Sequence, residues 1–496
     1  MEEIKMKHNF TPVIGIEVHV VLNSKTKMFS SSKSSHNDIA NTNISPIDLG
    51  HPGVMPQPNK ECIKKGIILA HALNMEISKD IIFDRKNYFY QDLPKGFQIT
   101  QQFYPIGKNG KLDIGNNEFI DIERIHLEED TAKQTIEDGK ILLDYNRAGL
   151  PLIEIVTKPC IKNSKQASAF LKALRRILVF NNISDAKLEE GSMRADINIS
   201  VMPIGSKQYG TRVEIKNINS ISNVEKAIEF EINRQINTTL STHESVQQET
   251  RRFDDKTFST VFMRLKTNAV DYHYMCEPNI HVRRIDDKFI KETIKENYVN
   301  INDIISNLEK ENVSNEFINL LMDDYDLFKV FKEMNKVVNN ANEVVKWLCV
   351  ELVGLISKDN KSINDIQIEK INKISNMIKM LLDKKINGKQ AKEILKFIYE
   401  TNDSLEDIIE KNNFKQITDE KIIANVLVNY LNQNKKMLDQ YNDRPERVEK
   451  FFIGMVMKDT NGQANPEVTT TVFNKFLKTY QDSKDKENLV FDNKLI

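Results

Sequence analysis

The segment Ile14-Gly15-Ile16-Glu17-Val18-His19-Val20 alternates apolar and polar side chains along its length. On a β-strand, successive side chains point to opposite faces, so the apolar residues share one face, and Glu17 and His19 share the other. The segment therefore predicts a strand that packs one face into a hydrophobic core. A carboxylate and an imidazole held side by side on rigid backbone suit a metal ion or a proton-transfer site. The alternative interpretation is a sheet whose second face simply lies in water.

The same alternation recurs between turn signals through roughly the first 296 residues. It predicts strands at 13–22, 120–127, 152–156, 193–201 and 213–218, and helices at 165–180 and 222–235. After residue 299 the apolar residues follow helical spacing, as in the stripe Ile371, Ile374, Ile378 and Leu381, and Asn387-Gly388 is expected to end a helix. We therefore expect an α+β fold: a mostly antiparallel sheet with helices, then an all-helical middle and an all-helical C-terminal tail. The expected domains are 1–296, 297–404 and 405–496.

Composition excludes several classes of protein. The 496 residues include 70 Lys and Arg against 71 Asp and Glu, a net charge of −1, which excludes a uniformly basic nucleic-acid coat but leaves room for a local basic groove. The cysteines are scattered, so there is neither a Cys-x-x-Cys zinc knuckle nor a disulfide framework, as is typical of a reducing compartment. The first residues do not resemble a secretory signal, and no apolar run is long enough to span a membrane. We expect a cytoplasmic protein without membrane contact.

Acidic and basic side chains gather on the polar faces of three further predicted strands. Glu128, Glu129 and Asp130 follow one another and either face water or hold a divalent cation such as Mg²⁺. In 193–201, Arg194 and Asp196 share a face, and in 213–218 Glu214 and Lys216 do the same. Carboxylates that hold Mg²⁺ beside cations that offset phosphate charge are the groups that phosphoryl transfer requires.

Two other stretches could contact a nucleotide or another anion. Residues 83–90 place Arg85 and Lys86 among aromatic side chains, which suits stacking on a base or ribose, although aromatic clusters are more often part of a core. Arg147 lies in a polar turn before a strand, free to reach an anion. Residues 205–212 have the glycine spacing of a P-loop but lack its Gly-Lys-Ser/Thr ending, and strands flank them, so we reject that interpretation.

Taken in order, these segments resemble the B-subunit family of the aspartyl/glutamyl-tRNA amidotransferases. The resemblance rests on Ile-Gly-Ile-Glu-Val-His at 14–19, Phe-Asp-Arg-Lys-Asn-Tyr-Phe-Tyr at 83–90, His-Leu-Glu-Glu-Asp at 126–130, Glu-Glu-Gly-Ser-x-Arg-x-Asp at 189–196, and Glu-x-Lys-Asn-x-Asn-Ser at 214–220. Near the end, Gly-Gln-Ala-Asn-Pro at 462–466 is similar to the tail of that family. The resemblance spans essentially the whole chain.

The resemblance implies a cradle-like N-terminal domain, a helical middle and a helical tail that holds tRNA. It implies an ATP-dependent and Mg²⁺-dependent reaction that phosphorylates the side-chain carboxylate of Glu or Asp on misacylated tRNA and then amidates it with ammonia. A partner amidase (glutaminase) would make the ammonia from glutamine, and a small third protein of the same complex would bind the two together. By resemblance, the metal site would be lined by Glu17, His19, Glu128 and Glu129, the adjoining catalytic floor would contain Asp196 and Glu214, and the phosphate or substrate contacts would be Arg85, Lys86, Arg147, Arg194 and Lys216.

The chain departs from the family pattern at some positions. Residues 271–279 lack a proline and an acid that are common there, and Cys160 stands where an Asp is common. Some relatives carry a cysteine pair near 42–53, which is absent here, so we predict no zinc. Two alternatives to the enzyme are a tRNA-binding scaffold with a decayed site and an unrelated Mg²⁺-dependent nucleotide-binding enzyme. The acids and His19 that the site would need argue against decay.

Overall fold

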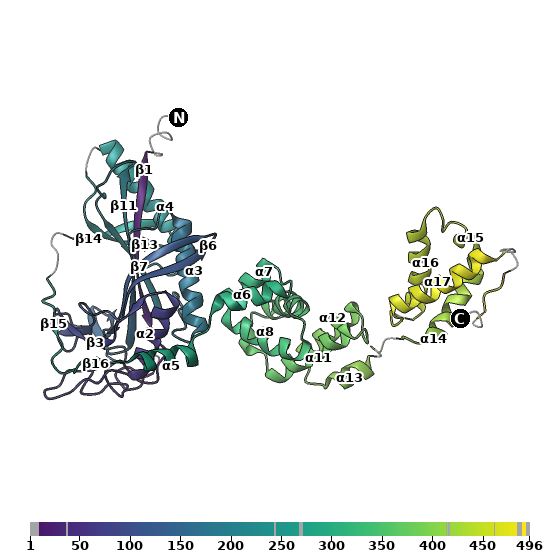
Figure 1. Ribbon diagram of the computed structural model, residues 1–496, viewed down its shortest axis with the longest axis horizontal. Coiled ribbons are helices and arrows are strands. Elements are labelled where there is room, and N and C mark those ends of the chain that lie inside the picture. The colour runs from purple at the N-terminus through teal and green to yellow at the C-terminus, as the bar shows by residue number, and fades with distance from the viewer. Residues whose placement is uncertain are drawn as a thin grey trace. The chain divides into compact units, whose positions relative to one another are not determined.

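Strand β1 (Phe10–Val21) lies in the middle of a nine-stranded sheet (Figure 1). The computed structural model describes residues 9–492, apart from 36–37, 243–244, 267–270, 413, 415–416, 461 and 484–488. Within these residues the sheet has the order β14-β13-β12-β11-β1-β10-β7-β6-β2. Its neighbours pair antiparallel, except for β12 and β13, which run parallel. The other strands are β2 (Glu76–Ile77), β6 (Gly107–Gly115), β7 (Glu118–Glu129), β10 (Pro151–Thr157), β11 (Met193–Pro203), β12 (Val213–Lys216), β13 (Glu249–Asp254) and β14 (Ser259–Leu265).

One face of this sheet is covered by helices. Helix α2 (Lys60–Ala72) packs on β6 and β7, α3 (Ser164–Phe180) on β6 and α4, and α4 (Ile221–Asn237) on β11, while α5 (Asp287–Asn297) packs on α2. The apolar side chains of β1 turn to this side, and Ile14, Ile16, Val18 and Val20 are at most 1% exposed. Leu171, Leu174 and Leu178 of α3 join the same core. Burial of this apolar surface therefore fixes which face of each strand is covered.

A smaller sheet stands at the other face. It has the order β15-β4-β5, formed by β15 (Met275–Cys276), β4 (Asp84–Asn87) and β5 (Phe97–Thr100). The small sheet is tied to the end of β7, because Gln98 Nε2 donates to the Glu129 carbonyl at 2.7 Å and the Ile99 amide donates to the Glu129 carboxylate at 3.0 Å. Two strand pairs complete this unit: β3 (Asp80–Ile81) with β16 (Arg283–Arg284), and β8 (Lys133–Glu137) with β9 (Lys140–Asp144).

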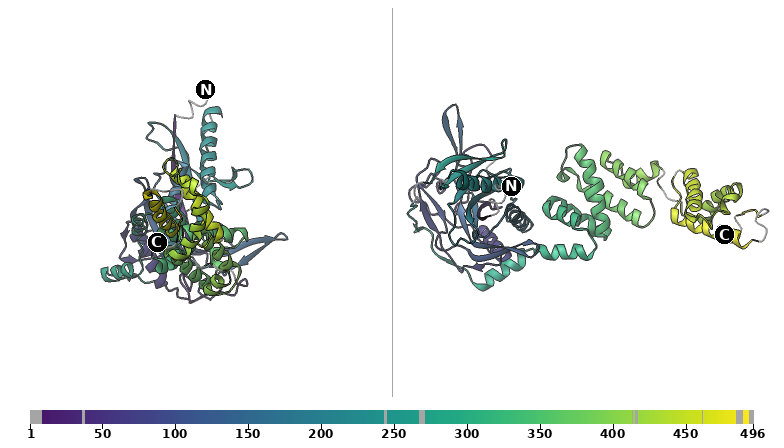
Figure 2. Two further views of the ribbon diagram at one scale, coloured as in Figure 1. Left: turned by 90° about the vertical axis from the view of Figure 1, so that its right-hand side faces the viewer. Right: turned by 90° about the horizontal axis from the view of Figure 1, so that it is seen from above.

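The chain divides into two units, residues 1–303 and 304–496. The described residues of the second unit form helices joined by turns and loops (Figure 2). In the described residues, no helix combines the length and apolar composition needed to cross a bilayer. The helices from the end of the first unit onward are α6 (Ile301–Lys310), α7 (Asn315–Asp323), α8 (Tyr325–Val338), α9 (Ala341–Val345), the π-helical segment Lys346–Leu352, α10 (Val353–Lys358), the 3₁₀ segment Ile363–Asp365, α11 (Ile368–Leu382), α12 (Gly388–Glu400), α13 (Leu405–Lys411), α14 (Glu420–Gln433), α15 (Lys435–Leu438), α16 (Pro445–Asp459) and α17 (Pro466–Asp482).

The predicted α+β class, the predicted strands and the helices at 165–180 and 222–235 are confirmed. One local prediction is wrong. Asn387-Gly388 begins a helix instead of ending one, because Asn387 caps α12 by accepting from the Gln390 amide at 2.9 Å while the Gln390 side chain accepts from the Asn387 amide at 2.9 Å. The division of the helical part at residue 404 stays a prediction.

Candidate functional site

A large cleft of about 1140 Å³ lies on the face of the main sheet that the helices leave uncovered. Its floor comes from β1, β7, β10, β11 and β12, and one wall comes from the small sheet and the segment that leads into β15. Its lining includes Glu17, His19, Lys86, Tyr88, Arg124, His126, Glu128, Glu154, Asp196, Asn198, Arg212, Glu214, Lys216, Lys266, Tyr272 and Tyr274.

A cluster of one imidazole and two carboxylates lies on this floor. Antiparallel pairing sets His19 directly opposite Glu154 of β10, and Glu128 of β7 lies opposite Leu152 of β10. His19 Nε2 is 3.4 Å from Glu128 Oε1 and 3.6 Å from Glu154 Oε2. These three side chains offer ligand atoms that all lie within 4.8 Å of one another. We call His19, Glu128 and Glu154 the acidic cluster.

A second histidine, His126, adds positive charge beside the acidic cluster. It is opposite Glu154 on β7, it is buried, and its Nε2 is 2.8 Å from Glu154 Oε2. Burial lowers the pKa of both histidines, but the neighbouring carboxylates outweigh burial and raise each pKa to about 9. Burial raises the pKa of Glu154, but the two histidines more than offset this and hold it well below its ordinary value. The protein therefore places two acids deep in the cleft and balances them with positive charge.

The acidic cluster fits a divalent cation by its donor set. Carboxylate oxygens are the ligands that Mg²⁺ and Mn²⁺ take, and an imidazole nitrogen is a further ligand suited to transition metals. Glu128 Oε2 also accepts from the Thr100 hydroxyl at 3.2 Å, which orients the carboxylate. His126 Nδ1 is buried and has no hydrogen-bond partner within the described residues. His19 and Glu128 are thus brought together as predicted, with Glu154 in place of the other two predicted ligands.

Glu17 lies two residues from His19 on the same face of β1, so it is next to the acidic cluster on the floor of the cleft. Its Oε1 accepts from Asn198 Nδ2 at 2.9 Å, and it lies opposite Asp196 on β11. Burial raises the pKa of Glu17, and the charges of Glu154, Asp196 and Glu214 raise it further. An excess of negative charge around Glu17 makes a bound cation favourable in this row as well.

Lys216 bridges the acids at the β12 side of the floor. Its Nζ is paired with Asp196 and lies 3.4 Å from Glu214 Oε1, while Lys266 Nζ lies 2.9 Å from Glu214 Oε2. Burial lowers the pKa of Lys216, but Asp196 and Glu214 raise it more, so the amine stays charged. Burial raises the pKa of Glu214, but Lys216 and Lys266 more than offset burial and bring the pKa below its ordinary value. This carboxylate therefore stays ionised. Asp196, Glu214 and Lys216 are therefore in the cleft, as the sequence predicts.

The structure does not bring Glu129 to the acidic cluster. Adjacent residues of a strand point to opposite faces, and Glu128 takes the cleft side. The Glu129 carboxylate is bound by Lys95 Nζ and by the Ile99 amide, and it is buried. The predicted metal role of Glu129 therefore does not fit this geometry.

The predicted cationic contacts divide into two groups. Lys86 lines the cleft, and its Nζ lies 4.6 Å from the Tyr272 ring centroid. Arg85 turns away, because Glu277 binds it through Nε and Nη2 at 2.6 and 3.1 Å. Arg147 and Arg194 converge instead on a third residue, the buried Asp130, at 2.5 and 2.9 Å.

Aromatic side chains form the wall opposite the floor. Tyr88 packs edge-to-face against Tyr90 and Tyr272, and Tyr272 packs in the same way against Tyr274, with ring centroids 5.8 to 6.2 Å apart. The segment 271–279, where the sequence departs from the family pattern, thus supplies two rings to the wall, and its Glu277 fixes Arg85. This divergent segment is part of the cleft.

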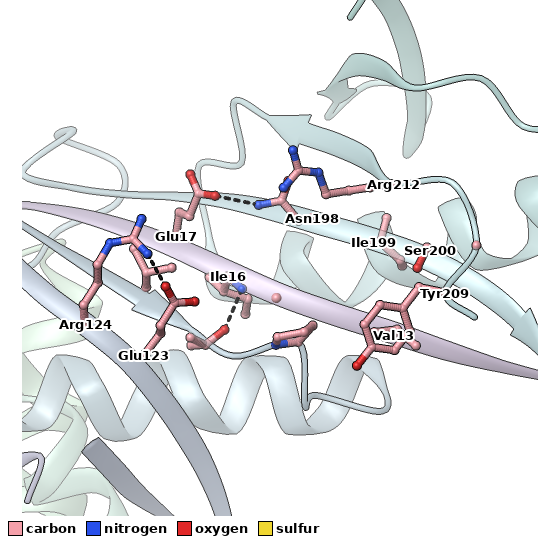
Figure 3. Close-up of a pocket in the computed structure, with 15 residues that line it drawn as sticks. Val13, Ile16, Glu17, Glu123, Arg124, Asn198, Ile199, Ser200, Tyr209 and Arg212 are labelled. Atoms are coloured by element: carbon pink, nitrogen blue, oxygen red, sulfur yellow. Dashed lines mark hydrogen bonds and ion pairs between the residues drawn. The ribbon is translucent and has the colours of Figure 1, made fainter. Parts of the chain in front are cut away.

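A second, smaller pocket of about 420 Å³ adjoins the cleft along β1 (Figure 3). It shares Glu17, Arg124, Asn198 and Arg212 with the cleft. Figure 3 shows Glu17 and Asn198 joined at one end, with Val13 and Tyr209 at the other.

Sequence patterns gave no site role to Glu154 and His126, and they gave Asp130 only a place in a run of three acids that faces water or holds a cation. Glu154 carries the clearest signal, since it is the lone acid in the otherwise apolar run 150–156. His126 alternates with Glu128 on β7, so period-2 spacing places both on one face. The pairing of Asp130 with two arginines has no such signal, because Arg147 and Arg194 come from other segments.

Comparisons with known proteins cover most of the chain. Residues 12–291 match the family described as the GatB/GatE catalytic domain, and residues 329–477 match the GatB domain. The B-subunit of the aspartyl/glutamyl-tRNA(Asn/Gln) amidotransferase from Malacoplasma penetrans is 67% identical over 478 residues, which is 96% of this chain and 99% of that protein. The proteins of the same name from Ureaplasma urealyticum and Mycoplasma pneumoniae are 50% and 45% identical over 474 and 479 residues, each covering at least 95% of this chain and 99% of its own length.

Proposed function

This chain belongs to the GatB/GatE catalytic-domain family, and from that premise we propose that it acts as the B-subunit of a tRNA-dependent amidotransferase. Such an enzyme converts Glu-tRNA(Gln) or Asp-tRNA(Asn) into the correctly amidated Gln-tRNA or Asn-tRNA. The observation that carries the proposal is an acidic cluster, flanked by lysines, on the floor of the cleft within the matched domain. A scaffold with a decayed site would have no need of this cluster.

We propose an ATP-dependent ligase reaction in two steps. A side-chain carboxylate oxygen of the aminoacyl group attacks the γ-phosphorus of ATP, the bond to the β-phosphate oxygen breaks, and ADP leaves. The product is an acyl phosphate. Ammonia then attacks the acyl carbon, the acyl–oxygen bond breaks, phosphate leaves with the electron pair, and the nitrogen loses a proton to give the amide. Activation is needed because a carboxylate is a poor acyl donor to ammonia.

The residues of the cleft suit the charge that gathers in the first step. His19, Glu128 and Glu154 would hold Mg²⁺, which when bound offsets charge on the transferred phosphoryl group. Lys86 stands on the wall with no carboxylate partner among the described residues, so its charge is available for an anionic substrate. Lys216 is held by Asp196 and Glu214 on the floor. The tyrosine wall would limit the access of water to the acyl phosphate.

The proposed function requires partners. Ammonia would come from an amidase (glutaminase) partner, and a small third protein would complete a complex of three subunits. The misacylated tRNA would bind along this chain, with the helical tail 405–496 contributing weak contacts to its backbone. Because the reaction serves protein synthesis, we place it in the cytoplasm.

The test uses the assembled complex with ATP, Mg²⁺, glutamine and Glu-tRNA(Gln). We expect Glu128→Gln to lower Gln-tRNA formation by about 100-fold or more, because the cluster loses a charged ligand, while tRNA binding is retained. The matched control is Glu118→Gln on the same strand, where the acid is exposed and bonded to the Gln166 side chain. Equal activity of Glu128→Gln and the control would support the scaffold interpretation and overturn the proposed chemistry.

A further inference from the structure

A group of four charged side chains lies between α4 and β13, on the face of the sheet that is otherwise covered by apolar contacts. Glu231 and Arg234 come from α4, and Glu249 and Arg251 come from β13. Arg234 Nη2 lies 2.7 Å from Glu231 Oε1 and 2.9 Å from Glu249 Oε1, and Arg251 Nη1 lies 2.9 Å from that same Glu249 oxygen. The two acids and two arginines balance each other in charge. We call Glu231, Arg234, Glu249 and Arg251 the ion network.

Strand β14 joins the ion network through Thr260. The Thr260 hydroxyl donates to Glu231 Oε2 at 2.8 Å and accepts from Arg251 Nε at 2.9 Å, while Arg251 Nη2 donates to the Thr260 carbonyl at 2.7 Å. Glu231 is fully buried. Buried ion pairs add little stability compared with apolar side chains of the same volume, because the cost of desolvation offsets their attraction, and their best-attested use is to fix a register. The ion network therefore points to a role in placing β13.

The register of β13 matters because of how this strand meets β12. Among the described neighbours of the main sheet, β12 and β13 are the parallel pair, and α4 connects them, so no tight turn fixes their register. The observed register sets Thr250 directly opposite Glu214. A slip of one residue would instead set Glu249 or Arg251 opposite Glu214. Since the ion network binds both of these residues, it holds Thr250 in its place.

Thr250 contacts the floor of the cleft from the other face of β13. It is 1% exposed, and its hydroxyl donates to Glu214 Oε2 at 3.0 Å. Lys266 Nζ lies 2.9 Å from the same oxygen, and the Lys266 amide donates to the Gln248 carbonyl at 2.8 Å, which continues the pairing of β13 with β14. Glu214 Oε1 is thereby turned toward Lys216 Nζ, 3.4 Å away. Contacts from β13 and from the residue after β14 thus fix the orientation of Glu214.

The orientation of Glu214 determines where the amine of Lys216 lies. Lys216 lines the cleft, and its Nζ is held between Asp196 and Glu214. We propose that Thr250 is a positioning residue for the amidation reaction: the ion network fixes its register, and its hydroxyl orients Glu214 so that Lys216 presents its charge to the anionic substrates. The proposal rests on the function proposed above. A valine would fill the same space in the strand, so the hydroxyl is the part of Thr250 that this role requires.

The first test compares Thr250→Val with Thr250→Ser in the assembled complex with ATP, Mg²⁺, glutamine and Glu-tRNA(Gln). Thr250→Val should lower kcat for Gln-tRNA formation by about 10-fold, because Glu214 loses a hydrogen bond, and should leave the KM for tRNA within about twofold, since Thr250 is buried below the floor. Thr250→Ser keeps the hydroxyl and should lose less than about threefold in kcat. The melting temperatures should follow the opposite order, because valine suits a buried strand better than serine. The matched control is Thr293→Val, at an equally buried threonine on α5, which should leave kcat unchanged.

The second test links the ion network to Thr250 by a double-mutant cycle. Arg251→Lys keeps the charge but loses the planar group that binds Glu249 and Thr260 together. Arg251→Lys alone is expected to lower kcat by about threefold, and it should cause no further loss in the Thr250→Val background, because both changes act through Glu214.

The other outcomes separate this inference from the proposed function. Wild-type kcat in Thr250→Val would overturn the inference and leave the amidotransferase function intact. Losses of kcat that follow the losses of melting temperature in both Thr250 variants would also overturn it, because Thr250 would then have only a structural role. Additive losses in the cycle would show that the ion network does not act through Thr250. If the wild-type complex forms no Gln-tRNA with ATP, the proposed function fails and this inference fails with it.

Discussion

The same strands form both faces of the main sheet, but one face is apolar and buried whereas the other is charged and lines the cleft. On the covered face of β1, Ile14, Ile16, Val18 and Val20 are at most 1% exposed beneath the helices. On the uncovered face, Glu17 and His19 lie among acids and bases and keep part of their surface in the cleft. A strand with period-2 alternation can therefore be a structural element on one side and a binding surface on the other.

The comparison teaches where stability and function reside. The covered face gains free energy from apolar burial, at about 25 cal/mol per Å². The uncovered face concentrates like charges, which raises the pKa of Glu17 and requires histidines and lysines as compensation. Like-charged groups gathered in a cleft are unfavourable for folding but useful for binding a cation or a phosphate. Substitutions placed on each face test this difference directly.

The largest expected effect is on the covered face. Ile197 is fully buried between Ile16 and Ile215, so Ile197→Ala should lower the free energy of unfolding of the first unit by about 2–5 kcal/mol. The neighbouring Asn198 points into the cleft, and Asn198→Ala removes one hydrogen bond to Glu17, which costs about 0.5–1.5 kcal/mol. Urea denaturation of both variants measures the difference. Equal losses of unfolding free energy in the two variants would contradict the conclusion that the covered face supplies most of the stability.

The second effect is on metal binding at the uncovered face. Glu154→Gln should weaken the affinity for Mn²⁺, followed by electron paramagnetic resonance, by about 10- to 100-fold, since a charged ligand becomes a neutral one. Glu118→Gln, the exposed control on β7, should leave the affinity unchanged. If both variants bind Mn²⁺ as the wild type does, the acidic cluster is not the metal site, and its histidines serve only to neutralise the acids.

Much of the fold follows from the sequence because it depends on local periodicity. Alternation identifies β1, β7, β10, β11 and β12, and helical spacing identifies α3 and α4. The Asn387 error arose because Asn-Gly fits either end of a helix, and only the side-chain contact with Gln390 shows which end it marks. The small sheet could not be derived as a whole, because β15 joins it through pairs almost 200 positions apart in the sequence, such as Met275 with Arg85.

The sequence predicts those parts of the candidate site in which the residues lie on one strand. Period 2 places Glu17 with His19, and Asp196 with Arg194, on shared faces. It does not reveal which strands are neighbours, so Glu154 was missed although it lies opposite His19. It also separates Glu128 from Glu129, which the family resemblance had grouped. Arg85, Arg147 and Arg194 look available in the sequence, but Glu277 and Asp130 bind them through pairings that only the tertiary fold creates.

The smallest expected effect concerns one thiol on each side of the sheet. Cys62 lies on α2 in the core of the covered face, where burial raises its pKa to about 12, whereas Cys276 is exposed on β15 of the small sheet. The thiolate is the reactive form, so iodoacetamide at pH 8 should modify Cys276 in the folded protein and reach Cys62 only after unfolding. Peptide mass mapping measures both sites in one sample, and denatured protein provides the reference for full modification. Rapid labelling of Cys62 in folded protein would show that solvent reaches the face that the helices cover. That result would contradict the proposed difference between the two faces.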